Sequence, residues 1–174
     1  MVRAYRNPLL SYNGYMRTNA PELGADLLVD FLNTLDVEDD VDQLAADDGH
    51  RRWASEHGLE PGDRATTQQA RDALRAIVDG DASPAGLPAL ALPVDAAPGA
   101  VGLSPRTVAD AAVASALVLS IQGKLGRVKL CGGEDCRWAF YDASRNGSRQ
   151  WCSMEVCGNR QKARTYRSKE RDGS

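Results

Sequence analysis

The four cysteines of this sequence are its clearest candidates for chemistry, because they form two equally spaced pairs in the last third of the chain. Four residues separate the members of each pair, and fifteen residues separate the pairs. Thiolates in such clusters bind Zn²⁺ tetrahedrally, and a reducing compartment favours metal over disulfides. We therefore predict one zinc ion, with two disulfides as the alternative. The predicted ligands are Cys131, Cys136, Cys152 and Cys157.

The predicted zinc is structural rather than catalytic, because a metal held by four cysteines has no open position for water. A segment of about 45 residues is also too short to build a stable hydrophobic core by itself. We therefore predict a small C-terminal module, residues 126–174, that folds around its metal.

A strongly basic segment follows the last cysteine and predicts a helix over residues 159–170. At about 100° per residue, Arg160, Arg164, Arg167 and Arg171 share one narrow stripe of this helix. Clustered arginines repel one another unless phosphates or carboxylates face them. We interpret the stripe as a nucleic-acid contact. The alternative is a helix that docks on the acidic body of the same chain.

Further polar residues extend this candidate interface. Asn146 and Gly147 predict a tight turn between the cysteine pairs, with Arg145 and Arg149 close to it. Contacts to phosphate groups are expected to dominate the affinity for DNA. The predicted nucleic-acid-binding residues are Arg145, Arg149, Asn159, Arg160, Lys162, Arg164, Arg167 and Arg171.

The net charge of −3 hides a strong asymmetry along the chain. Residues 1–122 hold 9 Lys and Arg against 18 Asp and Glu, a net charge of −9. Residues 123–174 hold 12 against 6, a net charge of +6. An acidic body with a basic end is typical of a chain that binds a polyanion through that end.

Several function classes find no support in the sequence. The two histidines, His50 and His57, are expected on one exposed side of a helix. No catalytic serine motif, phosphate-binding loop or dinucleotide fingerprint is present, so we do not expect an enzyme. No run of about 18 apolar residues exists, and the first residues lead into no apolar stretch. We therefore expect a cytoplasmic protein that does not contact membranes.

The remaining sequence predicts a mainly helical body of the α+β class with a small β-hairpin. The second helix is expected as one piece or as two with a break at Gly49. Thr66 or Thr67 is the expected cap of the third helix, and Ser104 with Pro105 begins the fourth, which is the most apolar. The expected elements are helices over residues 22–36, 40–57, 66–79 and 104–122, strands over 90–92, 100–103 and 127–130, and an arm over 1–21.

The cysteine-rich segment resembles the CGNR zinc-finger family over about residues 127–168. The tetrad that gives the family its name stands here as Cys157, Gly158, Asn159 and Arg160. The start of the ABATE domain, which precedes this finger in many bacterial proteins, is similar to the sequence LVDFLNT of residues 28–34.

These resemblances imply a bacterial transcription regulator with two domains. Residues 1–125 would form a helical ABATE-like domain that senses a small-molecule effector or forms a homodimer. Residues 126–174 would form a zinc-ribbon-like finger that binds DNA. Asn33 and Thr34 are the implied ligand contacts, unless they serve as the polar end of the first helix. The alternative function is a zinc-stabilised module that binds protein or RNA without sequence-specific DNA binding.

Overall fold

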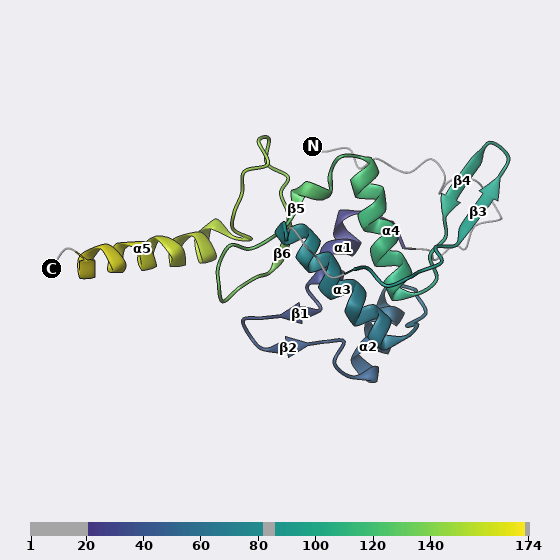
Figure 1. Cartoon of the computed structure of the whole chain (residues 1–174), viewed down its shortest axis with the longest axis horizontal. Helices are drawn as coiled ribbons and strands as arrows, with labels where there is room; N and C mark the ends of the chain where they lie inside the picture. The colour runs from purple at the N-terminus through teal and green to yellow at the C-terminus, as the bar shows by residue number, and fades with distance from the viewer. Residues whose placement is uncertain (1–20, 82–85, 173–174) are drawn as a thin grey trace.

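The computed structural model describes residues 21–81 and 86–172, with side chains up to Ser168, and is mainly helical as the sequence predicts. Residues 1–20 of the expected arm lie outside the described residues. None of the described helices has the length and apolar character needed to cross a membrane. The described helices are α1 (Ala25–Leu32), α2 (Asp47–Glu56), α3 (Arg64–Asp79), α4 (Val108–Ile121) and α5 (Asn159–Asp172) (Figure 1). The described strands form three antiparallel pairs: β1 (Leu35–Asp36) with β2 (Val41–Asp42), β3 (Val94–Ala97) with β4 (Ala100–Leu103), and β5 (Val128–Leu130) with β6 (Ala139–Tyr141).

Helix α4 packs against both α1 and α3 (Figure 1). Its sequence is apolar nearly all round, so most of its side chains are buried. Phe31 and Leu28 of α1 and Leu74 of α3 are almost fully buried in the same core. The ring of Trp53 from α2 meets the ring of Phe31 edge-on at a centroid distance of 5.8 Å. The predicted helix with the most apolar sequence is thus buried over most of its residues.

The two longest helices of the body begin at residues other than those the sequence suggested. Asp63, not Thr66 or its neighbour, caps α3, and its carboxylate accepts a hydrogen bond from the Thr66 amide at 2.8 Å. Thr107, not Ser104, caps α4 and forms a reciprocal capping box with Asp110. Cap preference alone does not choose among nearby Ser, Thr and Asp residues, because all three types are favoured at this position.

A small hairpin replaces helix between α1 and α2. Helix α1 ends at Leu32, earlier than predicted, and β1 then pairs with β2. In the turn, Asp40 adopts a left-handed φ of 53°. The carboxylate of Asp42 accepts a hydrogen bond from the backbone amide two residues on, at 2.8 Å. Such local carboxylate bonds compete with helix formation, so α2 starts only after this segment.

Helix α2 is continuous and packs more deeply than predicted. Gly49 lies within it rather than at a break, and a Cβ at this position would lie 2.1 Å from the carbonyl oxygen of Gln43. The expectation that both histidines are exposed is wrong for His50, which is only 3% exposed. His57 stacks on Trp53 with ring centroids 3.7 Å apart.

The β3–β4 hairpin confirms the expected hairpin with one shift. Its second strand lies where the sequence predicted it, but the first is Val94–Ala97 rather than residues 90–92. The antiparallel register pairs Ala97 directly with Ala100, so the strands are joined by a tight turn at Gly99, whose φ is 79°. Such a turn requires the first strand to end immediately before it.

The β5–β6 hairpin connects the cysteine-rich module with the helical body. The predicted strand before the first cysteine is present as β5. Val128 and Ala139 are buried in the same core as α1 and α4. Arg75 of α3 donates hydrogen bonds to the carbonyls of Leu32 at 2.7 Å and Arg137 at 2.9 Å. The predicted boundary at residues 125 and 126 thus falls where both parts share one core.

Candidate metal centre and nucleic-acid interface

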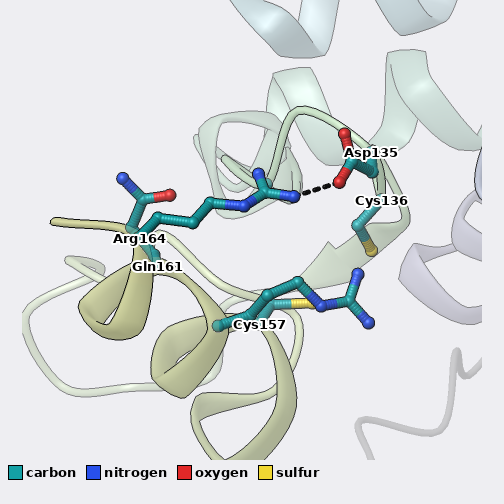
Figure 2. Close-up of a pocket in the computed structure, with 7 residues that line it drawn as sticks. Asp135, Cys136, Cys157, Gln161 and Arg164 are labelled. Carbon is teal, nitrogen blue, oxygen red and sulfur yellow. Dashed lines mark hydrogen bonds and ion pairs between the residues drawn. The ribbon is translucent and has the colours of Figure 1, made fainter. Parts of the chain in front are cut away.

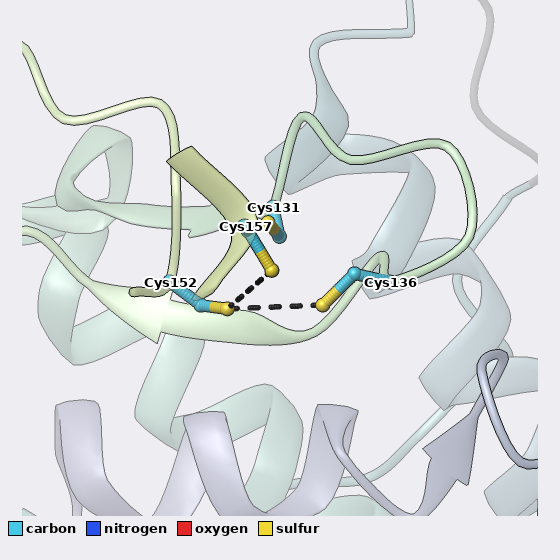
Figure 3. Close-up of side chains that lie close together, drawn as sticks. All are labelled: Cys131, Cys136, Cys152 and Cys157. Atoms are coloured by element: carbon cyan, nitrogen blue, oxygen red, sulfur yellow. Dashed lines mark hydrogen bonds between the residues drawn. The ribbon is translucent and has the colours of Figure 1, made fainter. Parts of the chain in front are cut away.

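The four predicted zinc ligands converge on one point (Figure 3). Their sulfur atoms all lie within 4.8 Å of one another. Cys152 Sγ lies 3.7 Å from Cys136 Sγ and 3.6 Å from Cys157 Sγ, and all four are free thiols. A disulfide needs a separation of about 2 Å, whereas tetrahedral ligation with Zn–S bonds of about 2.3 Å places sulfurs about 3.8 Å apart. The donor set and its spacing suit one structural zinc ion.

A cation would also stabilise the cluster, because crowded thiolates in a buried site repel one another. Burial and the neighbouring Cys157 raise the pKa of Cys136 to about 11, and burial with the surrounding sulfurs also raises the pKa of Cys152. Burial would raise the pKa of Cys131 too, but backbone hydrogen bonds outweigh it and lower that pKa. Bound Zn²⁺ would supply the charge that lets all four ligate as thiolates.

Two glycines let the chain close tightly around the sulfurs. We call residues 131–136 the first knuckle and residues 152–157 the second knuckle. A Cβ at Gly132 would lie 3.2 Å from the ring of Trp151, and one at Gly158 would lie 2.6 Å from Met154 Sδ. The second knuckle ends in a π-helical turn, Met154–Gly158, that runs directly into α5. The metal site therefore sets where α5 begins and which way it points.

The helical body holds the first knuckle from the other side. Arg137 directly follows Cys136 and adopts a left-handed φ of 52°. Its carbonyl accepts the hydrogen bond from Arg75, and its guanidinium pairs with Asp79 at 2.5 Å. The strained backbone at Arg137 is thus fixed by two residues of α3.

Asn33 and Thr34, the predicted ligand contacts, are both buried and both bonded within the protein. The side-chain amide of Asn33 donates to the carbonyl of Ala139 at 3.0 Å and accepts from the Ala139 amide at 2.7 Å. The hydroxyl of Thr34 donates to the carbonyl of Phe31 at 2.7 Å. The Thr34 bond fits the alternative interpretation, in which these residues complete the end of α1, whereas the Asn33 side chain bonds to β6 instead.

The loop of residues 142–150 is ordered around Asp142, which is fully buried. Its carboxylate accepts hydrogen bonds from the backbone amides of Ser144 at 3.0 Å and Arg149 at 2.8 Å. Lys129 of β5 pairs with it at 2.9 Å. Bonds from Ser144, Lys129 and Arg149 hold the pKa of Asp142 well below its usual range. The predicted turn is present, with Gly147 at a φ of 59°.

Two arginines of this loop, which the sequence predicted as contacts of the same kind, make different contacts. Arg145 is exposed at the turn. The guanidinium of Arg149 instead donates to the carbonyl of Cys152 at 2.7 Å and lies 5.1 Å from the ring centroid of Phe140. Both arginines are exposed, but Arg149 also bonds to the second knuckle and so braces it.

Helix α5 extends away from the rest of the molecule (Figure 1). Its first two stripe arginines pair with carboxylates: Arg160 with Glu38 at 2.9 Å, and Arg164 with Asp135 of the first knuckle (Figure 2). The side chains of Arg160 and Arg164 nevertheless remain 37% and 35% exposed, so neither is buried. The alternative of docking on the acidic body is thus realised in part, by Arg160 and Glu38.

The remaining predicted contacts on α5 differ in their surroundings. Arg167 and Lys162 are exposed, and no ion pair is found for either among the described side chains. Asn159 is exposed and donates to the carbonyl of Glu155 at 3.0 Å. The side chain of Arg171 lies beyond the described side chains.

Sequence reasoning missed the arginines that tie the body together. Arg71 and Arg75 of α3 are only 3% and 8% exposed. Arg71 forms a bidentate pair with Asp42 at 2.5 and 3.0 Å. Thr67, Arg71 and Arg75 follow one another at four-residue steps, and this spacing was the available signal because it places all three on one side of the helix.

Comparison with known families agrees with this architecture. Residues 25–127 match the ABATE family, described as "Putative stress-induced transcription regulator", and residues 127–170 match the CGNR zinc finger. The ABATE match covers more than half of the chain, so the protein belongs to the ABATE family and carries a C-terminal CGNR zinc finger. No curated protein matches the chain.

Proposed function

We propose that this protein is a DNA-binding transcription regulator whose zinc-stabilised finger contacts DNA through α5 and the loop of residues 142–150. The observation that carries the proposal is an exposed basic surface on α5 and the neighbouring loop, next to the four-cysteine site. Arg145, Lys162 and Arg167 have no carboxylate partner among the described side chains, and Arg160 and Arg164 lie in exposed pairs. Exposed guanidinium groups bind phosphate oxygens in bidentate fashion.

The arrangement suits contact with the phosphate backbone first. Three or more cations spaced along one rigid helix can neutralise successive phosphates, which fixes register and orientation but carries no sequence information. Base reading then falls to a side chain near the start of α5, and Asn159 and Arg160 are the proposed candidates. Arg149 enters the proposal as a residue that supports the loop, because its guanidinium is bonded to the second knuckle.

The helical body completes the proposal as the sensing or dimerising part of a cytoplasmic, non-enzymatic regulator. The family to which it belongs supports regulation. Asn33 and Thr34 would act there by linking a bound effector to the end of α1, since both already join α1 to its surroundings.

One observation favours the second candidate, a finger that binds protein or RNA. An open groove of about 340 Å³ runs beside α5, on the side away from the arginine stripe. Its lining includes Trp151, Met154 and Tyr166, and the last two are 53% and 65% exposed. Aromatic side chains beside cations also stack on unpaired bases.

The two candidates are separated by competition. The zinc-loaded full chain is titrated against a fluorescein-labelled DNA duplex, and the complex is challenged with unlabelled duplex or with single-stranded RNA of equal length. We expect the duplex to compete better than the RNA, and we expect chelation of zinc to abolish binding. Preferential displacement by RNA, or no duplex binding at all, would favour the second candidate.

A further inference from the structure

A notch between the first knuckle and α5 is lined by two arginines of that helix. Its lining includes Gly133, Asp135, Arg160, Gln161 and Arg164, and Figure 2 shows the side chain of Arg164 reaching Asp135 across it. Arginine side chains that line one notch are candidates to bind phosphate groups. Both already have an acidic partner from the same chain.

The two acidic partners come from different parts of the fold. Asp135 belongs to the first knuckle, so its pair with Arg164 lies entirely within the finger. Glu38 lies in the turn between β1 and β2, so its pair with Arg160 connects the helical body to the DNA-binding helix. Asp36 holds this turn, since its carboxylate accepts a hydrogen bond from the Glu38 amide at 3.0 Å.

Both pairs are exposed enough to be exchanged. The side chains of Glu38 and Asp135 are 42% and 57% exposed, and those of their arginines are 37% and 35% exposed. Ion pairs this accessible to water are weak, because solvent screens them and ordering both side chains costs entropy. A phosphate has more charge and more acceptor oxygens than a carboxylate, so it competes well for the same guanidinium.

We propose that Glu38 and Asp135 are built-in competitors of DNA: each carboxylate occupies the position on Arg160 or Arg164 that a backbone phosphate takes. The inference rests on the proposed function and deepens it by naming how the site is regulated. Binding of DNA exchanges two internal ion pairs for two phosphate contacts. The pair with Glu38 also makes the affinity of the finger depend on where the body holds the β1–β2 turn.

The β1–β2 turn is well placed to report changes in the body. The segment that follows it is bonded to the end of α1, because the Gln43 amide donates to the carbonyl of Thr34 at 2.8 Å. Asp42, next to Gln43, holds the bidentate pair with Arg71 of α3. A shift at the end of α1 would therefore move Glu38 relative to Arg160.

The test compares acidic residues that pair with α5 against neighbours that do not. Glu38→Gln and Asp135→Asn remove the proposed competitors. Asp39→Asn and Glu134→Gln are matched controls, because each removes the same charge from an adjacent exposed position that forms no ion pair with the described side chains of α5. Affinity for a labelled duplex is measured with the zinc-loaded full chain at one ionic strength, and zinc content and circular dichroism confirm equal folding.

We expect Glu38→Gln and Asp135→Asn each to tighten duplex binding by about twofold to fivefold more than its control, as for the release of an exposed ion pair. In an Arg160→Gln background, Glu38→Gln should give no more gain than Asp39→Asn. Equal gains for paired and control positions in a protein that binds the duplex would overturn the competitor proposal alone. Failure of every version to bind would overturn the proposed function with it.

Discussion

Asn33 at the end of α1 forms two hydrogen bonds with the backbone of Ala139 in β6, one in each direction. The two residues are 106 positions apart in sequence, and both are buried. A side-chain amide that pairs with a backbone in this way acts like one more strand residue. The finger hairpin is thereby fixed to the body, and the orientation of α5 relative to the body follows from it.

Replacement of Asn33 by Ala should lower the free energy of unfolding by about 2–4 kcal/mol, because it leaves a buried N–H and a buried C=O of Ala139 without partners. Urea unfolding monitored by circular dichroism measures the change. Asn159→Ala is the control, since that amide is exposed and makes one bond, and we expect a change within about 0.5 kcal/mol. Equal effects would show that the Asn33 bonds are not important for stability.

Purified protein should contain one zinc ion per chain, since the four sulfurs are spaced for tetrahedral ligation. Cys157→Ser should lose the metal on dialysis, and the helical signal of α5 should fall because its start is fixed by that ligand. Metal analysis and circular dichroism report both effects. Ser148→Ala, an exposed change in the adjoining loop, should retain its zinc; zinc retained by the cysteine variant would contradict the assigned ligand set.

The pair between buried Arg71 and partly buried Asp42 should make a large and pH-dependent contribution to stability. Arg71→Met leaves the Asp42 carboxylate unpaired and should cost about 3 kcal/mol at neutral pH. Arg64→Met is the control on the same helix, because its pair with Asp47 is exposed and should contribute about 1 kcal/mol or less.

The pH dependence follows from the pKa of Asp42. Partial burial would raise this pKa, but the hydrogen bonds from Arg71 and Leu44 outweigh it and lower the pKa below the ordinary value of an aspartate. Folding therefore favours the ionised form, so the contribution is complete above about pH 4 and is lost as the pH falls below it. The difference in stability between wild type and Arg71→Met should narrow over that acidic range. A difference that widens would contradict the lowered pKa of Asp42.

Substitutions of Arg145 and Arg149 should affect different properties, although both residues lie in one loop: the first should affect DNA binding and the second stability. Arg145→Ala should weaken duplex binding with stability within about 0.5 kcal/mol of wild type, because its side chain is exposed. Arg149→Ala should cost about 1 kcal/mol of stability, because it removes the bonds to the second knuckle. Thermal unfolding alongside anisotropy titration checks both, and the opposite pattern would exchange their roles.

Local patterns were sufficient to predict the elements that depend on nearby residues. The apolar sequence of α4, the basic helix after Cys157 and the turn at Gly147 follow from periodicity and turn chemistry, and all three are present. The cysteine spacing likewise predicted the metal site, because each pair closes a short loop. These features need little information from distant parts of the chain.

Features set by distant contacts were not predictable from the same patterns. Nothing local indicated that His50 would be buried or that Asn33 would bond to Ala139. The partners of the stripe arginines were equally hidden, since Glu38 reaches Arg160 from a turn whose two strands were expected as the ends of helices. A wheel diagram gives the face of a helix but does not give the charges opposite it.

The most direct test of the central claim, that the zinc finger binds DNA through its basic surface, is the salt dependence of duplex binding by the full chain. We predict a linear fall of log affinity with log salt, with a slope of about 0.9 for each phosphate neutralised. Arg167→Gln should lower that slope by about one such step. A flat salt response in wild type would contradict the account.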